Sequence, residues 1–317
     1  MMRKRSHFMI KLSTIPNAIY LFIFTFLIFS LMAPRFLSFM NWGNVIIQSC
    51  MLIIVSMGMT VVMLSNGIDL SVGSIMSFSG VTTGLYLASG GNPALAILVG
   101  IFTGCLCGVV NGVMIAKIGL PPFIATFGML GVADGLSLLF SGGVTVYWQE
   151  TTFNMIANSH PWSIPAPTLI SAGLFGIMYF ILYWTPFGVN VFAIGRNEES
   201  LRLSGVNILL NKIGIYTLSG IAASIAGLVL ASRISSAHPT GGFGYEFEAI
   251  AATVIGGTAF FGGKGGLTGT IIGALIIAMM RNGLSLMGYT TPLQYCFMGI
   301  LLTIGVTFNT LFYKSRD

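Results

Sequence analysis

The chain has 317 residues, of which 14 are basic and 8 acidic; charged residues make up 7% of it, and the net charge is +6. An average soluble domain carries roughly 25% charged residues, so this composition excludes a soluble enzyme, a disordered chain and a nucleic-acid-binding protein. Apolar residues reach 55%, and there are 41 glycines, which let membrane helices approach closely. We therefore predict an all-α, polytopic membrane protein.

Ten apolar segments approach or reach the length of about 20 residues that a membrane helix needs. The first follows a basic stretch and has no A-x-A cleavage site, so we interpret it as an uncleaved membrane helix and not as a signal peptide. The eighth is short. The predicted spans are residues 16–33, 45–65, 71–89, 93–116, 122–141, 168–185, 211–231, 247–262, 267–286 and 292–312.

The basic residues predict the orientation of these spans. With ten spans and a cytoplasmic start, eleven basic residues fall inside and three outside, the asymmetry that the positive-inside rule expects. The inside set is Arg3, Lys4, Arg5, Lys11, Lys117, Arg196, Arg202, Lys212, Lys264, Lys314 and Arg316, and the outside set is Arg35, Arg233 and Arg281. Both termini are therefore predicted to be cytoplasmic.

Only two segments in the body of the chain exceed a tight turn. They are residues 142–167, predicted outside, and residues 186–211, predicted inside. Each is shorter than the ~40 residues that an independent domain needs. We predict one transmembrane domain over residues 1–317.

Residues 66–73 interrupt the apolar pattern after the second span. Gly67 can break a helix, and Asp69 or Ser71 can cap the next one. A carboxylate at membrane depth is costly unless its oxygens are satisfied. The segment is either a cytoplasmic turn with a capping aspartate or a broken helix that lines a transport pathway.

Four glycines recur at every fourth position of the fourth span: Gly100, Gly104, Gly108 and Gly112. They lie on one face of a helix and predict a smooth groove for a neighbouring helix. The contact is either static packing or a moving interface.

The most charged stretch of the chain is residues 196–206. Asn197 can cap a short helix, Arg202 follows Glu198 by four residues, and Gly205 can end the helix. Such a solvent-facing helix is either a docking element for a cytoplasmic partner or an inert amphipathic turn. Its predicted residues are Arg196, Asn197, Glu198, Glu199, Leu201, Arg202, Ser204 and Gly205.

A glycine-rich interruption at residues 262–270 resembles the one at residues 66–73 in its glycine spacing, which indicates a weak internal repeat. It is not a nucleotide-binding loop, because that motif fails at Thr258 and Gly265. If ATP drives this protein, another subunit binds it.

No catalytic, metal or cofactor site is expected. The histidines His7, His160 and His238 are scattered, and the four cysteines lie in apolar runs. Asp134 and Glu248 are candidates for a proton relay, but they are isolated, and capping or helix packing also explains them.

Several ordered motifs across roughly residues 16–312 resemble one family. They are Gly58-Met-Thr60 with the 67–73 segment, Pro122–Thr126, Phe192–Gly205 and, most specific, Glu246–Gly269. In these motifs the chain is similar to the permease subunits of ribose-type sugar ABC importers, within a group that includes branched-chain amino-acid permeases. The chain departs from the pattern at Arg196, where a small residue is common, and in doubling a proline at residues 121–122.

The resemblance implies an ABC importer permease fold in a bacterial cytoplasmic membrane, without a cofactor. It implies as partners a second permease copy or paralogue, a cytoplasmic ATP-binding subunit and an extracytoplasmic sugar-binding protein. It also implies that the helix near residues 196–206 is the coupling helix to the ATPase. A branched-chain amino-acid permease and an ion-coupled secondary transporter are the alternatives.

A path for a neutral, hydroxyl-rich sugar needs few charges and a weak site. Thr60, Asn66, Gly67, Asp69 and Thr126 are our candidates for that path or for a hinge. Helix packing explains such residues equally simply. The family does not specify the sugar.

Overall fold

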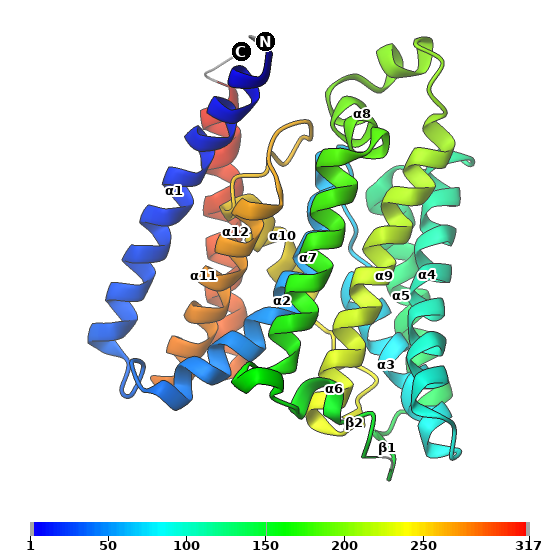
Figure 1. The fold of residues 1–317 in the computed structure, drawn as a ribbon, viewed down its shortest axis with the longest axis vertical. Helices are drawn as coiled ribbons and strands as arrows, with labels where there is room; N and C mark the ends of the chain where they lie inside the picture. Colours follow the sequence, from blue (N-terminus) through cyan, green and yellow to red (C-terminus); the bar gives the residue numbers. More distant parts are fainter. Residues whose placement is uncertain (1–2, 150, 315–317) are drawn as a thin grey trace.

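The computed structural model describes the backbone of residues 3–149 and 151–314, with side chains placed for residues 18–149, 151–301, 303 and 307. These residues form twelve α-helices, a 3₁₀ turn and a two-stranded ladder (Figure 1). The elements are α1 (Arg3–Met32), α2 (Phe39–Leu64), α3 (Val72–Ala88), α4 (Pro93–Ala116), α5 (Pro122–Ser141), β1 (Val146–Tyr147), α6 (Met155–Asn158), η1 (Pro161–Ser163), α7 (Ala166–Trp184), α8 (Pro186–Leu203), α9 (Ile208–Ile234), β2 (Ser236–Ala237), α10 (Tyr245–Ile255), α11 (Leu267–Leu286) and α12 (Thr291–Lys314).

Six of the described helices are long and apolar enough to cross a membrane: α2, α4, α5, α7, α9 and α11. Two shorter apolar helical segments are Ala18–Met32 and Val72–Ala88. Each of the ten predicted segments contains a helix. The all-helical membrane prediction is thereby confirmed in outline, and the count of about ten complete crossings stays a prediction.

Helix α2 is the centre of the bundle. All its residues from Ser49 to Leu64 are buried, and it packs against α7, α9, α10 and α11. By contrast, α4, α5 and α7 bury only about a third of their apolar spans. Their exposed apolar faces suit contact with lipid.

The two ends of the bundle differ. The start of α1, the end of α12 and all of α8 lie at one end, called here the α8 end; α6 and the β1–β2 ladder lie at the opposite, ladder end (Figure 1). The ladder pairs Val146 with Ala237 and Tyr147 with Ser236. An all-α prediction missed it, because two residues per strand carry no recognisable pattern. Of the basic residues that predict orientation, Arg316 lies outside the described residues, as do the side chains of Arg3, Lys4, Arg5, Lys11 and Lys314.

Two predicted elements need correction. The eighth span, predicted at residues 247–262, is the 11-residue α10. At 1.5 Å per residue it covers about 16 Å, roughly half of a ~30 Å hydrocarbon core. The connection predicted at residues 186–211 is mostly helical, because Pro186 occupies the first turn of α8 after the extended Thr185, where proline is favourable.

The glycine ladder of α4 packs closely on a neighbouring helix, as predicted, and that helix is α9. A Cβ at Gly104 would lie 2.5 Å from the Cβ of Ser224, and one at Gly108 would lie 2.8 Å from the Cα of Thr217. Both distances are too short for any larger side chain. The two helix backbones are therefore in direct contact over several turns.

Candidate functional site

The charged part of α8 is a separate short helix. Asn197 interrupts α8 with φ −162° and ψ 95°, and its side-chain oxygen accepts a hydrogen bond from the backbone N–H of Ser200 at 2.9 Å. The helix ends at Leu203, and Gly205 follows with φ +82°. The predicted cap and the predicted stop are both confirmed.

Two ion pairs involve this short helix, one within it and one to α9. Arg202 pairs with Glu199, one position away from the predicted Glu198, and Glu198 instead pairs with Lys212 of α9 at 2.7 Å. The hydrogen bond that Arg202 donates to the carboxylate of Glu199 raises the pKa of Arg202, because it stabilises the charged guanidinium. The Glu198 pair fastens the short helix to α9.

Two further predicted residues, Ser204 and Leu201, belong to this segment, together with Leu203. Ser204 bonds through its hydroxyl to the carbonyl of Ser200 at 2.9 Å. Leu201 packs against the core, whereas Leu203 is 80% exposed. Leu203, beside the charged Arg202, is an apolar side chain open to contact with a partner.

The backbone of α8 touches two other segments at a contact that we call the glycine junction. Its members are Leu64, Gly195, Gly262 and Gly263. The N–H of Gly263 donates to the carbonyl of Leu64 at 2.9 Å, and Arg196 donates to the carbonyl of Gly263 at 3.3 Å. A Cβ at Gly195 would lie 2.6 Å from the nitrogen of Gly263 and closer still to the carbonyl oxygen of Leu64. The end of α2, the kink of α8 and the α10–α11 loop therefore meet without side chains between them.

The interruption after α2 lies inside the bundle. Asp69 is fully buried, and its carboxylate accepts from the N–H and hydroxyl of Ser71 at 3.0 and 2.6 Å and from the hydroxyl of Ser219 at 2.8 Å. Asn111 of α4 donates to the Ser71 hydroxyl at 2.9 Å. Ser219 is near the middle of the 27-residue α9. This is the geometry of a broken helix and not of a surface turn.

The other predicted path residues occupy different surroundings. Thr60 is buried and its hydroxyl lies 2.7 Å from that of Thr270, between α2 and α11. Thr126 is also buried and donates to the carbonyl of Ile68 at 3.3 Å. Asn66 is exposed at the α8 end with φ +62°. Thr126 therefore contacts the segment that holds Asn66, Gly67 and Asp69, whereas Thr60 lies apart from it between α2 and α11.

A second irregular segment enters the bundle from the ladder end and leads into α10. The N–H of Gly242 donates to the hydroxyl of Ser77 at 2.8 Å, and Ser137 of α5 donates to the carbonyl of Pro239 at 2.9 Å. Gly73, in the first turn of α3, approaches both Gly242 and the carboxylate of Glu246. The N-terminal ends of α3 and α10 thus meet inside the bundle, an arrangement typical of discontinuous helices in transporters.

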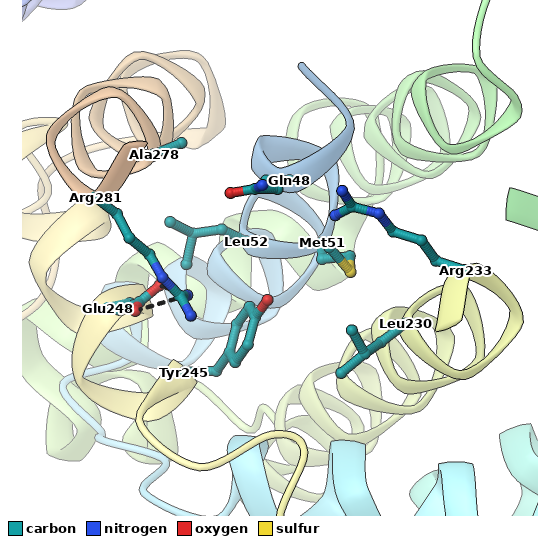
Figure 2. Close-up of a pocket in the computed structure, with 9 residues that line it drawn as sticks. All are labelled: Gln48, Met51, Leu52, Leu230, Arg233, Tyr245, Glu248, Ala278 and Arg281. Carbon is teal, nitrogen blue, oxygen red and sulfur yellow. Dashed lines mark hydrogen bonds and ion pairs between the residues drawn. The ribbon is translucent and has the colours of Figure 1, made fainter. Parts of the chain in front are cut away.

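Beside the start of α10 lies a cavity of about 210 Å³, called here the polar pocket. Figure 2 shows its lining from four helices: Gln48, Met51 and Leu52 of α2, Leu230 and Arg233 of α9, Tyr245 and Glu248 of α10, and Ala278 and Arg281 of α11. Arg281 donates to the carboxylate of Glu248 at 3.1 Å. The guanidinium of Arg281 lies 6.0 Å from the centre of the Tyr245 ring.

None of the predicted path residues lines this pocket. The sequence offered one signal for it: Glu248 and Arg281 are charged residues within apolar segments, and such residues mark functional sites more often than not. From the sequence alone, Glu248 is expected in a proton relay or in helix packing, and Arg281 among the basic residues outside the membrane. Their ion pair depends on the packing of α10 against α11, which the sequence does not give.

Comparisons with known proteins agree over nearly the whole chain. The family described as "Branched-chain amino acid transport system / permease component" matches residues 41–306. The ribose import permease protein RbsC of Bacillus subtilis (strain 168) is 38% identical over 306 residues, 96% of this chain and 95% of the relative. The D-allose transport system permease protein AlsC of Escherichia coli (strain K12) is 34% identical over 90% of this chain and 89% of its own. The fructose import permease protein FrcC of Rhizobium meliloti is 34% identical over 98% and 88%. No solved structure gives a significant match.

Proposed function

The chain belongs to the branched-chain amino acid transport system permease family, and from this premise we propose that it is the transmembrane permease subunit of an ATP-driven, binding-protein-dependent importer of a monosaccharide. The observation that carries the proposal is the similarity, along almost the full length, to permeases named for ribose, allose and fructose. The chain is a transport subunit and not an enzyme. ATP hydrolysis belongs to a separate subunit.

The partners and the orientation are part of the proposal. A cytoplasmic ATP-binding subunit docks on the Asn197–Ser204 helix, a sugar-binding protein docks at the ladder end, and a second permease copy or paralogue completes the channel. The chain crosses the cytoplasmic membrane about ten times, with both termini and the α8 end inside. The exposed, capped helix with an outward Leu203 supports the docking role.

Transport follows alternating access. The binding protein delivers the sugar to the ladder end, and ATP binding and hydrolysis on the partner switch the permease pair between outward and inward states. Force must reach the bundle through contact, and the glycine junction is where α8 touches α2 and the α10–α11 loop. Asp69 and its serine partners are proposed as a hinge, because they hold an irregular segment at the centre of the bundle.

The test uses the complete complex. The chain is expressed with its ATP-binding and sugar-binding partner proteins, reconstituted in proteoliposomes, and assayed for uptake of labelled ribose, allose, fructose and leucine. Uptake of a sugar that requires both ATP and the binding protein is the expected result. Uptake of leucine alone would make the chain an amino-acid permease. Uptake that survives ATP depletion but not collapse of the ion gradient would make it a secondary transporter.

A further inference from the structure

The polar pocket combines two kinds of lining. Its apolar wall is formed by Met51, Leu52 and Leu230. Figure 2 shows Met51 and Leu52 between Arg233 on one side and the Glu248–Arg281 pair on the other. At about 210 Å³ it lies below the ~300–1,000 Å³ of sites for drug-sized ligands. It is a site for a small ligand with both polar and apolar faces.

Two polar groups in this lining have no side-chain partner within the described part of the chain. Among the described residues, neither Arg233 nor Gln48 forms a side-chain hydrogen bond or an ion pair, and Figure 2 shows both side chains directed into the pocket. A half-buried guanidinium and amide that are left free are costly unless water or a ligand satisfies them. They supply several donors and one acceptor at the rim of the cavity.

The opposite wall is prearranged. The Glu248 carboxylate is buried and fixed by Arg281, and the Tyr245 ring lies beside that pair. A carboxylate accepts hydrogen bonds from hydroxyls, whereas a guanidinium donates to them. The Glu248–Arg281 pair is neutral as a unit, so Arg233 leaves the lining with one uncompensated positive charge. A neutral polyol can use the donors of Arg233 and the acceptor oxygens of Glu248 together, and comparison with an anionic counterpart tests whether the extra charge selects an anion instead.

The depth of the pocket places it on the route from the ladder end. Arg281 lies five residues before the end of α11, about 7 Å along the axis, and Gln48 lies nine residues after the start of α2, about 14 Å. Its inner wall is the first turn of α10, where the second irregular segment ends. The pocket therefore joins the ladder end to the broken helices.

We infer that the polar pocket is a sugar subsite of the permease itself, in which Gln48, Arg233 and Glu248 bind the hydroxyls of a neutral monosaccharide and the apolar wall covers its C–H face. The inference rests on the proposed function and specifies the site for it. The subsite is open on one side and binds weakly, so that the sugar is released onward.

The experiment measures sugar binding without the binding protein. The permease–ATPase complex is purified in nanodiscs, and saturation-transfer NMR is recorded with D-ribose, D-allose and D-fructose, and with D-ribonate as an anionic counterpart. Gln48→Leu and Arg233→Gln should each reduce the sugar signal at least fivefold. The matched controls are Gln149→Leu and Arg35→Gln, which change exposed residues outside the pocket and should leave the signal unchanged. Gln48→Asn replaces the leucine variant if that variant fails to assemble with the ATPase.

The outcomes separate the pocket from the function. Equal sugar signals in the wild type and both pocket variants, or binding of ribonate alone, would overturn the subsite even if the wild type imports sugar. Variants that bind sugar normally but need more binding protein for uptake would make the pocket a docking surface and would also overturn it. A wild-type complex that imports no sugar in proteoliposomes would overturn the proposed function itself.

Discussion

Replacing Gly195 by alanine tests whether the glycine junction transmits force from α8. The new Cβ would lie 2.6 Å from the nitrogen of Gly263 and closer still to the carbonyl oxygen of Leu64. Contacts below 3.0 Å essentially never occur for a real Cβ. The two segments must move apart, and this movement strains the hydrogen bond that Gly263 donates to Leu64.

The size of the effect follows from two opposing terms. Alanine in a helix is favoured over glycine by roughly 0.5–1 kcal/mol, whereas overpacking a tight contact costs about 1–3 kcal/mol. The atoms opposite Gly195 are backbone and not flexible side-chain ends, so the second term wins. The gain from alanine is the same in every state in which α8 is helical, so it does not shift the switch. Only the packing cost of about 1–3 kcal/mol does so, and where it falls on one of the two states it shifts their equilibrium about 5- to 150-fold.

The assay is ATP hydrolysis by the reconstituted complex, with and without sugar-bound binding protein. Gly195→Ala should assemble with the ATPase but lose at least fivefold of the stimulation. The control is Gly176→Ala on α7, where a Cβ would meet nothing within 4 Å; it should behave as the wild type or be slightly more stable. Normal stimulation in Gly195→Ala, with the complex intact, would show that coupling does not pass through the junction.

Three further predictions address topology, packing and docking. Cysteines introduced at His160 and Leu203 in a cysteine-free background should react with an impermeant thiol reagent from opposite sides of the membrane; same-side labelling would refute the ten-span orientation. Gly108→Leu should push α4 away from α9 and lower the yield of assembled complex, whereas the control Gly176→Leu on α7 should not. Equal yields of the two variants would refute close packing as a requirement. The double reversal Glu198→Lys and Glu199→Lys should insert normally but lose ATPase association or stimulation. Because one exposed ion pair contributes only ~0–1 kcal/mol, both charges are reversed together. Unaltered coupling in the double variant would refute the docking role.

Sequence patterns succeed here where local physics decides the outcome. Asn197 caps its helix and Gly205 ends it because each acts on backbone groups within a few residues. The α4 glycine ladder predicts a close neighbour because a helix face without side chains lets another helix backbone approach it. The identity of that neighbour, α9, is a property of the packing, and nothing in the ladder specifies it.

The polar pocket shows the opposite case. Gln48, Arg233 and Arg281 lie far apart in the sequence on three helices, and each alone resembles a helix-end or packing residue. Thr60 and Asp69 are candidates for the transport path because they are polar within apolar segments, yet hydrogen bonds within the bundle satisfy both. Polar residues in a membrane span must be satisfied somewhere, and the sequence cannot say whether the partner is a neighbouring helix or a ligand.

The glycine junction contacts the helices that form most of the polar pocket. The junction fixes the end of α2 and the loop between α10 and α11, and these three helices supply seven of the nine residues that line the pocket. A side-chain contact can absorb a small displacement by changing rotamer, but a backbone contact without a Cβ between the segments cannot. A movement of α8 of about an ångström therefore has to displace α2 or the α10–α11 loop, and with them one wall of the pocket. If sugar binding and coupling are linked in this way, Gly195→Ala should alter the sugar signal of the permease–ATPase complex although residue 195 is remote from the pocket. An unchanged signal would mean that the two sites move independently.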